Sequence, residues 1–294
     1  GNEGPGLGVD YGSGDCCIAT WSSSMNQVEI IPANLGGSCS PSWIAFTATQ
    51  QLNGEAAKKL SVVDPKNSFS QLKRLLGTQL FDEDVVKLRA KVAYAMKTNP
   101  NQKASLLVQS VFQNSADQPS QSFKSISYSA EEASSMIISY LRELALNHLG
   151  HAPTLAVVGV PYHFTTEQRE ALTAAIALAG LKVGELVEEP VCIALAYGLN
   201  RFKGSKTVLV CDAGLHSFRS SLIEIDGPRI SVSAHELDTH SGGEFVDQLL
   251  FDYCVREFVR QHPRGLSSFL SDPQYSSSRL RLYLAVEGAK RTLS

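Results

Sequence analysis

The stretches LGVDYGSGDCCIATW (residues 7–21) and VLVCDAGLHSFRSSLIEI (residues 208–225) share one pattern. In each, an apolar strand runs into an aspartate, Asp10 or Asp212, turns over the glycine two positions later and leaves as a second strand. Such a glycine lets backbone N–H groups approach a phosphate, and the carboxylates can hold Mg²⁺ through its waters. Either turn alone is more typical of an ordinary β-turn. The repeat favours two hairpins that grip one triphosphate.

The bulk composition is that of a folded globular chain. Of 294 residues, 43% are hydrophobic and 19% are charged, which leaves room for one large or two ordinary domains. The net charge of −3 gives no support for a nucleic-acid or anionic-membrane partner. No apolar run reaches the roughly 18 residues of a membrane span, and GNEGPG (residues 1–6) is not a signal peptide. We therefore expect a cytoplasmic protein.

The cysteines indicate the same compartment. The chain has no C-x-x-C pair, and most of its cysteines lie in apolar contexts. They are Cys16, Cys17, Cys39, Cys192, Cys211 and Cys254. We expect buried free thiols in a reducing environment. No ligand spacing supports a zinc site.

The first part of the chain reads as a β-meander with strands in residues 6–12, 16–22, 27–33 and 42–48. NSFSQLKRLLG (residues 67–77) resembles a helix closed by Gly77. Residues 82–128 are the least legible part, and QNSADQPSQSF (residues 113–123) within them is typical of a surface loop.

Strands and helices then alternate, which predicts an α/β fold. Ser129 with Glu132, and Thr165 with Gln168, form capping boxes for two helices that end at Gly150 and Gly180. Between them TLAVVGV (residues 154–160) has the pattern of a strand covered on both faces. A strand over residues 182–190 and a helix over 190–199, with Pro190 in its first turn, follow.

A second lobe begins near residues 200–205. Its pattern predicts a strand over residues 205–214, two more strands joined by IDGPR (residues 225–229), and a helix from Gly242 to about His262. After a loop, a last helix over residues 277–294 runs to the end without a stop signal, which suggests that the polypeptide continues.

Four longer stretches carry a family resemblance. They are DPKNSFSQLKRLLG (residues 64–77), VVGVPYHFTTEQREALTAAIALAGLKVGELVEEPVCIALAYGL (157–199), DTHSGGEFVDQLL (238–250) and VEGAKRTLS (286–294). Together with the two hairpins, they resemble in order the nucleotide-binding domain of the seventy-kilodalton heat-shock chaperones, the DnaK-like family. The resemblance covers nearly the whole chain. It implies an actin-like ATPase fold, with two ribonuclease-H-like lobes around a nucleotide cleft: lobe I over residues 1–202, an incomplete lobe II over 203–294, and no substrate-binding domain in this chain.

The resemblance also implies roles for matching residues. Lys73 matches the lysine that positions the attacking water and the γ-phosphate, and Glu189 matches the glutamate that orients water around Mg²⁺. Asp10 and Asp212 match the two acids nearest the metal, which they hold through water; these four are the implied catalytic residues. The implied binding residues are Gly12, Ser13, Gly14, Asp15, Gly214, Leu215, His216, Ser217, Gly242 and Gly243 around the phosphates and Glu287, Lys290, Arg291 and Ser294 around adenosine, while Pro161 and Arg169 match a relay toward a substrate-binding domain.

The spacing of the four adenosine-pocket residues puts them on one helix face, where the arginine plane can stack on adenine. From spacing alone, an exposed charged face is the simpler interpretation.

The departures from the family cluster on the phosphates. Its first hairpin reads Asp-Leu-Gly-Thr-Thr, whereas this chain has Gly14 at the last position, followed by Asp15. Its second reads Asp-Leu-Gly-Gly-Gly-Thr-Phe-Asp, whereas this chain has Leu215 and His216 for two glycines and Arg219 for the final acid. Phe245 also replaces an acid after the Gly-Gly-Glu motif. Because catalysis by positioning is sensitive to shifts of about 1 Å, we expect nucleotide binding to outlast efficient hydrolysis.

Two functions follow from these observations. The first is the ATP-binding domain of a divergent chaperone, which hydrolyses ATP to ADP and phosphate to gate peptide binding and release. It implies ATP/ADP and Mg²⁺ as cofactors, and unfolded client polypeptides, J-domain proteins and nucleotide-exchange co-chaperones as partners. The second is a degenerate chaperone-like regulator or co-chaperone with weak or no hydrolysis. A sugar kinase of the same fold fits the full set of motifs less well.

Overall fold

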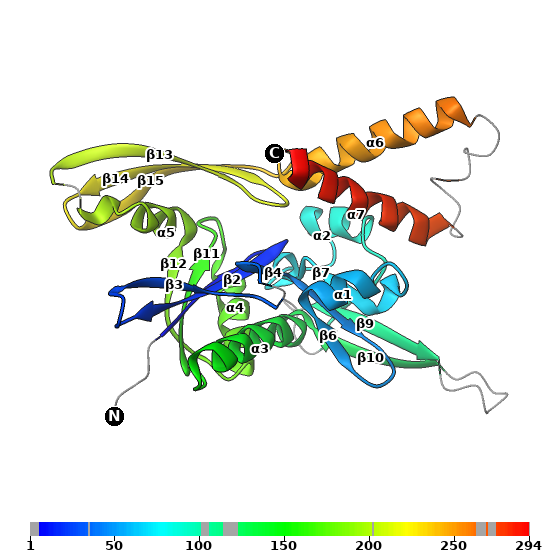
Figure 1. Ribbon diagram of the computed structural model, residues 1–294, viewed down its shortest axis with the longest axis horizontal. Helices are drawn as coiled ribbons and strands as arrows, with labels where there is room; N and C mark the ends of the chain where they lie inside the picture. Colours follow the sequence, from blue (N-terminus) through cyan, green and yellow to red (C-terminus); the bar gives the residue numbers. More distant parts are fainter. Residues whose placement is uncertain are drawn as a thin grey trace.

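Strand β1 (Leu7–Tyr11) lies inside the largest sheet of the computed structural model, between a parallel and an antiparallel neighbour. The sheet runs in the order β12 (Lys182–Glu188), β11 (Leu155–Val160), β1, β2 (Asp15–Ser22), β3 (Gln27–Ile31), with β4 (Cys39–Pro41) also paired to β2 (Figure 1). The structure describes residues 6–34, 36–100, 106–113, 123–201, 203–262, 269 and 275–293.

The two faces of this sheet have different environments. Leu7, Val9 and Tyr11 point into a core shared with helices α3 (Ala130–Leu149) and α4 (Thr166–Leu178), whereas Gly8 and Asp10 line a cleft on the other face. Strand β11 alternates in the same way. The expectation that residues 154–160 are covered on both faces is therefore wrong, because Val157 faces the cleft and is 40% exposed.

The segment after β3 builds two small antiparallel sheets in place of a continued meander. One has the order β6 (Gln51–Asn53), β5 (Trp43–Phe46), β7 (Ser68–Ser70), and the other β10 (Phe123–Ser129), β9 (Leu106–Gln113), β8 (Ala95–Thr98). The expected fourth meander strand is thus wrong in its partner. Strands β3 and β4 already occupy one edge of β2, so the chain leaves that sheet and forms β5.

The helix expected over residues 67–77 is also wrong. Strand β7 and a 3-10 turn, η2 (Leu72–Leu75), take its place, and the left-handed Gln71 (φ 57°) separates them. Phe69 is fully buried, with its ring centroid 5.7 Å from that of Phe46 and 5.0 Å from that of Tyr94. Burial of this ring in an extended segment outweighs the local helical pattern. Residues 114–122 of the expected surface loop lie outside the described residues.

The helices that open with a capping box were predicted correctly. Ser129 accepts from the N–H of Glu132 at 3.0 Å, and Thr165 accepts from that of Gln168 at 3.3 Å, at the starts of α3 and α4. Gly150 follows α3 in a left-handed conformation. The shorter helices are α1 (Gly54–Leu60), α2 (Glu83–Arg89) and α5 (Glu189–Ala196), which has Pro190 in its first turn as expected.

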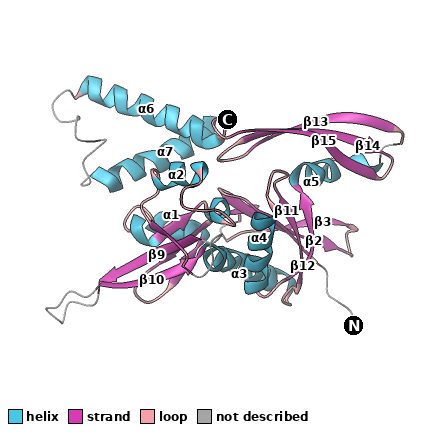
Figure 2. Ribbon diagram, turned by 180° about the vertical axis from the view of Figure 1, so that it is seen from behind, coloured by secondary structure: helices cyan, strands magenta, loops and turns pink. Residues whose placement is uncertain are grey.

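The last part of the chain forms one antiparallel sheet and a helix pair. The sheet is β13 (Ser205–Ala213), β14 (Phe218–Asp226) and β15 (Arg229–Asp238), and the helices are α6 (Gly243–Gln261) and α7 (Ser276–Leu293). Helix α5 packs against this sheet through Ala194, while α6 and α7 lie beside each other over α1 and α2 (Figure 2). All five elements were predicted. No helix in the described part of the chain has the length and apolarity to cross a membrane.

The expectation for the cysteines is wrong for three of the six. Cys17 and Cys39 face each other across β2 and β4, with their Cα atoms 4.5 Å apart, and form a disulfide. Cys211 is a free thiol but exposed, because alternate residues of β13 face outward. Of the other three, Cys16 is buried and Cys192 and Cys254 are partly buried.

Candidate functional site

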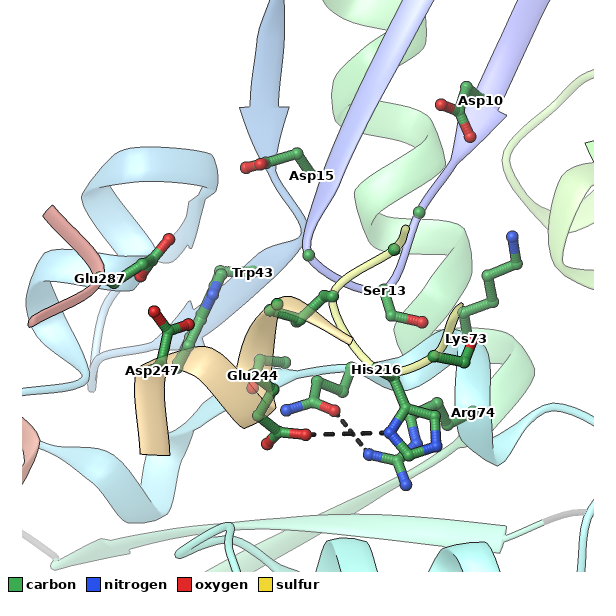
Figure 3. Close-up of a pocket in the computed structure, with 18 of the residues that line it drawn as sticks. Asp10, Ser13, Asp15, Trp43, Lys73, Arg74, His216, Glu244, Asp247 and Glu287 are labelled. Atoms are coloured by element: carbon green, nitrogen blue, oxygen red, sulfur yellow. Dashed lines mark hydrogen bonds and ion pairs between the residues drawn. The ribbon is translucent and has the colours of Figure 1, made fainter. Parts of the chain in front are cut away.

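One cleft of about 1520 Å³ runs between the main sheet and the β13–α7 part of the chain. The cleft brings together predicted site residues from distant parts of the sequence. It is lined by Asp10, Gly12, Ser13, Gly14, Asp15, Lys73, Pro161, Glu189, Asp212, Gly214, Leu215, His216, Ser217, Gly243, Glu287, Lys290 and Arg291. Gly242 and Arg169 lie just outside this lining, and Ser294 lies outside the described residues. Figure 3 shows Asp247 and Glu287 at one end of the cleft, Lys73 and Asp10 at the other, and Ser13 between them.

The first hairpin is tight because of its glycines. A Cβ on Gly12 would collide with the carbonyl oxygen of Asp15, so only glycine fits there. The carbonyl of Gly14 accepts from the N–H of Ser42 at 2.8 Å, which fixes the turn to the start of β5. A Cβ on Gly14 would lie 3.2 Å from the Leu215 side chain. Leu215 thus reaches from the second hairpin to the first.

The second hairpin is held by the start of α6. Gly214 donates to the Ser217 carbonyl at 2.9 Å, while the N–H groups of Gly243 and Glu244 donate to the carbonyls of Gly214 and Leu215 at 2.9 and 2.8 Å. Gly242 is needed for this approach, since a Cβ there would lie 2.5 Å from the backbone of Leu215 and His216. Neither Leu215 nor His216 has a positive φ, so the loss of two glycines causes no backbone strain in this turn.

Lys73 and Glu189 form a buried ion pair at the floor of the cleft. Lys73 Nζ lies 2.8 Å from Glu189 Oε1, and the two side chains are 7% and 15% exposed. The ammonium group also lies 5.8 Å from the ring centroid of Phe164, which sequence reasoning missed. Lys73 comes from η2 and Glu189 from the first turn of α5, so the pair joins segments 116 residues apart.

Arg219 joins the same group. Its Nη2 lies 2.9 Å from Asp212 Oδ2, its neighbour across β13 and β14, and its Nη1 donates to Glu189 Oε2. Burial alone would raise the pKa of Glu189, but the charges and hydrogen bonds of Lys73 and Arg219 lower it below its usual value. The pKa of Asp10 is raised, because its burial outweighs the attraction of Lys73 and Arg219. Glu189 and Asp212 thus carry cationic partners.

Helix α7 closes the other end of the cleft with one charged face. Glu287 binds Lys58 at 2.7 Å and Arg291 at 2.9 Å, and Arg291 also binds Asp15 at 3.0 Å. Lys290 binds Asp247, a fully buried carboxylate of α6, at 2.8 Å. The three described residues of the set all line the cleft, where Glu287 and Lys290 are partly buried and Arg291 is exposed. The partners Lys58 and Asp247 had no signal in the sequence.

A family model described as Hsp70 protein matches residues 6–294. The chain belongs to the Hsp70 family. Its fold is therefore the actin-like ATPase fold, and the matched part is the nucleotide-binding region of that family.

Curated relatives match the sequence over almost the whole chain. It is 36% identical to "Heat shock 70 kDa protein 2" of Paracoccidioides lutzii over 99% of its own length and 41% of the relative's. It is 35% identical to "Heat shock cognate 70 kDa protein 3" of Dictyostelium discoideum and to a ribosome-associated molecular chaperone of Saccharomyces cerevisiae, over 98% of the chain and 43% and 44% of those proteins. The chain thus spans less than half the length of the curated relatives it matches.

His216, which replaces a glycine of the family pattern, makes contacts of its own. His216 lies between two carboxylates, 3.7 Å from Asp84 and 3.8 Å from Glu244. Figure 3 shows the contact with Glu244. Although burial alone would raise the pKa of Glu244, the His216 imidazole and the Lys91 ammonium, 3.0 Å away, lower it to about 2. Asp84, Lys91 and Glu244 were not among the predicted site residues. His216 thus places the second hairpin next to the segment around α2.

Of the two residues expected in the relay, Pro161 lines the cleft and Arg169 lies outside its lining. Arg169 donates to the carbonyls of Phe164 and Tyr162 at 3.2 and 3.4 Å, which holds the turn that begins at the buried Pro161. Arg169 also lies 3.5 Å from Glu188, next to Glu189.

Proposed function

We propose that this chain binds ATP and ADP in its cleft as the nucleotide-binding domain of a divergent Hsp70 chaperone, and that it turns ATP over slowly. The observation that carries the proposal is the convergence in one cleft of both hairpins, the Lys73–Glu189 pair and the charged face of α7. Adenosine would lie against α7, where the Arg291 plane can stack on adenine, and the phosphates would lie between the hairpins.

Slow turnover follows from the altered hairpins. Leu215 reaches Gly14 across the space between them, and Arg219 binds Glu189, the carboxylate expected to orient water. Both contacts change how a γ-phosphate and an attacking water could be placed, and phosphoryl transfer relies on that placement. In the longer polypeptide, the nucleotide state would gate client binding through Pro161 and Arg169. Client polypeptides, J-domain and exchange co-chaperones, and a cytoplasmic location belong to this proposal.

A degenerate regulator that works without hydrolysis is the second candidate, and the Arg219–Glu189 contact favours it. Single-turnover hydrolysis separates the two, with ATP affinity measured by calorimetry on the same samples. We expect measurable binding and slow hydrolysis that Lys73→Ala abolishes. Lys59→Ala, which changes an exposed lysine, should leave both unchanged.

Binding without any turnover would support the regulator. Hydrolysis at the rate typical of chaperone ATPases would contradict the slow turnover proposed here. Failure to bind ATP or ADP at all would contradict the nucleotide site itself.

A further inference from the structure

The charges at the floor of the cleft nearly balance before any ligand binds. Asp10, Glu189 and Asp212 supply three carboxylates, and Lys73 and Arg219 supply two cations, which leaves one formal negative charge. A carboxylate at position 219 would make that charge three negative units, and one divalent cation would restore it to one. The arginine thus contributes the same net charge, one positive unit, as a carboxylate together with a bound divalent ion.

Glu189, the carboxylate expected to orient water around Mg²⁺, is not free to do so in this arrangement. Mg²⁺ keeps several waters in near-ideal octahedral geometry, and those waters need free carboxylate oxygens as acceptors. Both oxygens of Glu189 accept from cations, Oε1 from Lys73 and Oε2 from Arg219, and Oδ2 of Asp212 accepts from Arg219.

Arg219 still has donors to offer a ligand. It lines the cleft, and each of its Nη atoms carries a second N–H besides the one that pairs with Glu189 or Asp212. Its Nη2 lies under the second hairpin, 3.3 Å from where a Cβ on Gly214 would be. A guanidinium presents five N–H donors in a planar fork that matches phosphate oxygens.

We propose that the Arg219 guanidinium is the fixed cation of this cleft and contacts the phosphates of a bound adenine nucleotide, so that nucleotide binding needs no divalent ion. The inference rests on the proposed nucleotide site. It assigns to Arg219 the neutralisation of phosphate charge that a divalent ion would otherwise provide. The preference for phosphate comes from the guanidinium fork, since Arg–phosphate contacts are charge-assisted and often bidentate.

Calorimetry of ATP and ADP in excess MgCl₂ and in EDTA tests this directly on the unmodified chain. We expect the two dissociation constants to agree within about threefold. A weakening of about tenfold or more in EDTA would overturn the inference and leave the nucleotide site standing. Absence of binding under both conditions would overturn the nucleotide site and the inference together.

Variants supply a second test. Arg219→Asp should make binding depend on MgCl₂, and Arg219→Gln should weaken binding in both conditions. Arg229→Asp, an exposed arginine of the same sheet, is the matched control and should behave as the unmodified chain. If Arg219→Asp binds nucleotide better than the unmodified chain in EDTA, Arg219 obstructs the site and the inference is wrong.

Thermal unfolding without nucleotide gives a readout that does not depend on turnover. MgCl₂ should raise the Tm of Arg219→Asp, because the ion can then reduce the net charge of the cleft floor from three negative units to one, and should leave the Tm of the unmodified chain and of Arg229→Asp unchanged. An equal shift in all three proteins would overturn the proposed equivalence of arginine and ion. If Arg219→Asp does not fold, the EDTA comparison on the unmodified chain still decides.

Discussion

Glu189 shows what a single residue's sequence context can and cannot reveal. Its position before Pro190 predicted a place in the cleft, and the structure puts it there. Its partners could not be predicted, because Lys73 and Arg219 approach it from η2 and β14, elements fixed only by the tertiary fold. The sequence did flag Arg219 as the residue that reverses the expected charge. What was missing was the direction of its guanidinium.

His163 reports on the charge of Arg219. Burial and then the positive charge of Arg219 lower the pKa of this imidazole from 6.5 to about 4. The unfolded chain takes up this proton near pH 6.5 and the folded chain only near pH 4, so this group makes the unfolding free energy decrease as the pH falls through that window. Arg219→Gln should raise the pKa of His163, measured by NMR titration of the ring nitrogens.

Arg229→Gln, which changes an exposed arginine of the same sheet, is the control and should leave the His163 curve as it is in the unmodified chain. A His163 curve that is also unchanged in Arg219→Gln would show that the Arg219 charge does not reach this imidazole.

At the scale of elements, local sequence signals predicted where helices begin. Where those predictions failed, tertiary packing had determined the structure. The starts of α3 and α4 were predictable because a capping box is made by residues three apart. Residues 67–77 were not, because the burial of Phe69 between β5 and neighbouring rings is a long-range effect. The pairing of Cys17 with Cys39 likewise depends on β4 joining the edge of β2.

Gly77 anchors the segment that carries Lys73. Its φ is 63°, and a Cβ there would lie 2.6 Å from backbone atoms of Glu167 and Gln168 at the start of α4. Gly77→Ala should therefore lower the unfolding free energy by about 3–5 kcal/mol, the sum of left-handed strain and overpacking. Urea unfolding measures this loss.

Gly150→Ala is the matched control, since its φ is 75° and a Cβ there would meet nothing within 4 Å. It should lose only the conformational part, about 1–2 kcal/mol. Equal losses at Gly77 and Gly150 would show that contact with α4 does not hold the Lys73 segment.

At the scale of the molecule, ion pairs connect α7 to the first part of the chain. The Lys58–Glu287 side chains are 18% and 13% exposed, so their pairing is more strongly desolvated than a surface contact. A double-mutant cycle with Lys58→Met and Glu287→Gln should give a coupling free energy of about 1–2 kcal/mol by urea unfolding.

The pair between Lys87 and Glu83 on α2, 37% and 83% exposed, offers a comparison within the same protein. Its coupling should be smaller, because both side chains are solvated and the pair is screened. A Lys58–Glu287 coupling no larger than this would mean that the cleft is not held closed at its α7 end by charge.

A crystal structure of the chain grown with ADP and MgCl₂ tests the central claim most directly. The account predicts adenosine against α7 and a phosphate oxygen within about 3 Å of the Arg219 guanidinium, with no ion between Glu189 and Asp212. A hydrated Mg²⁺ between those two carboxylates, with Arg219 turned away from the phosphates, would contradict it.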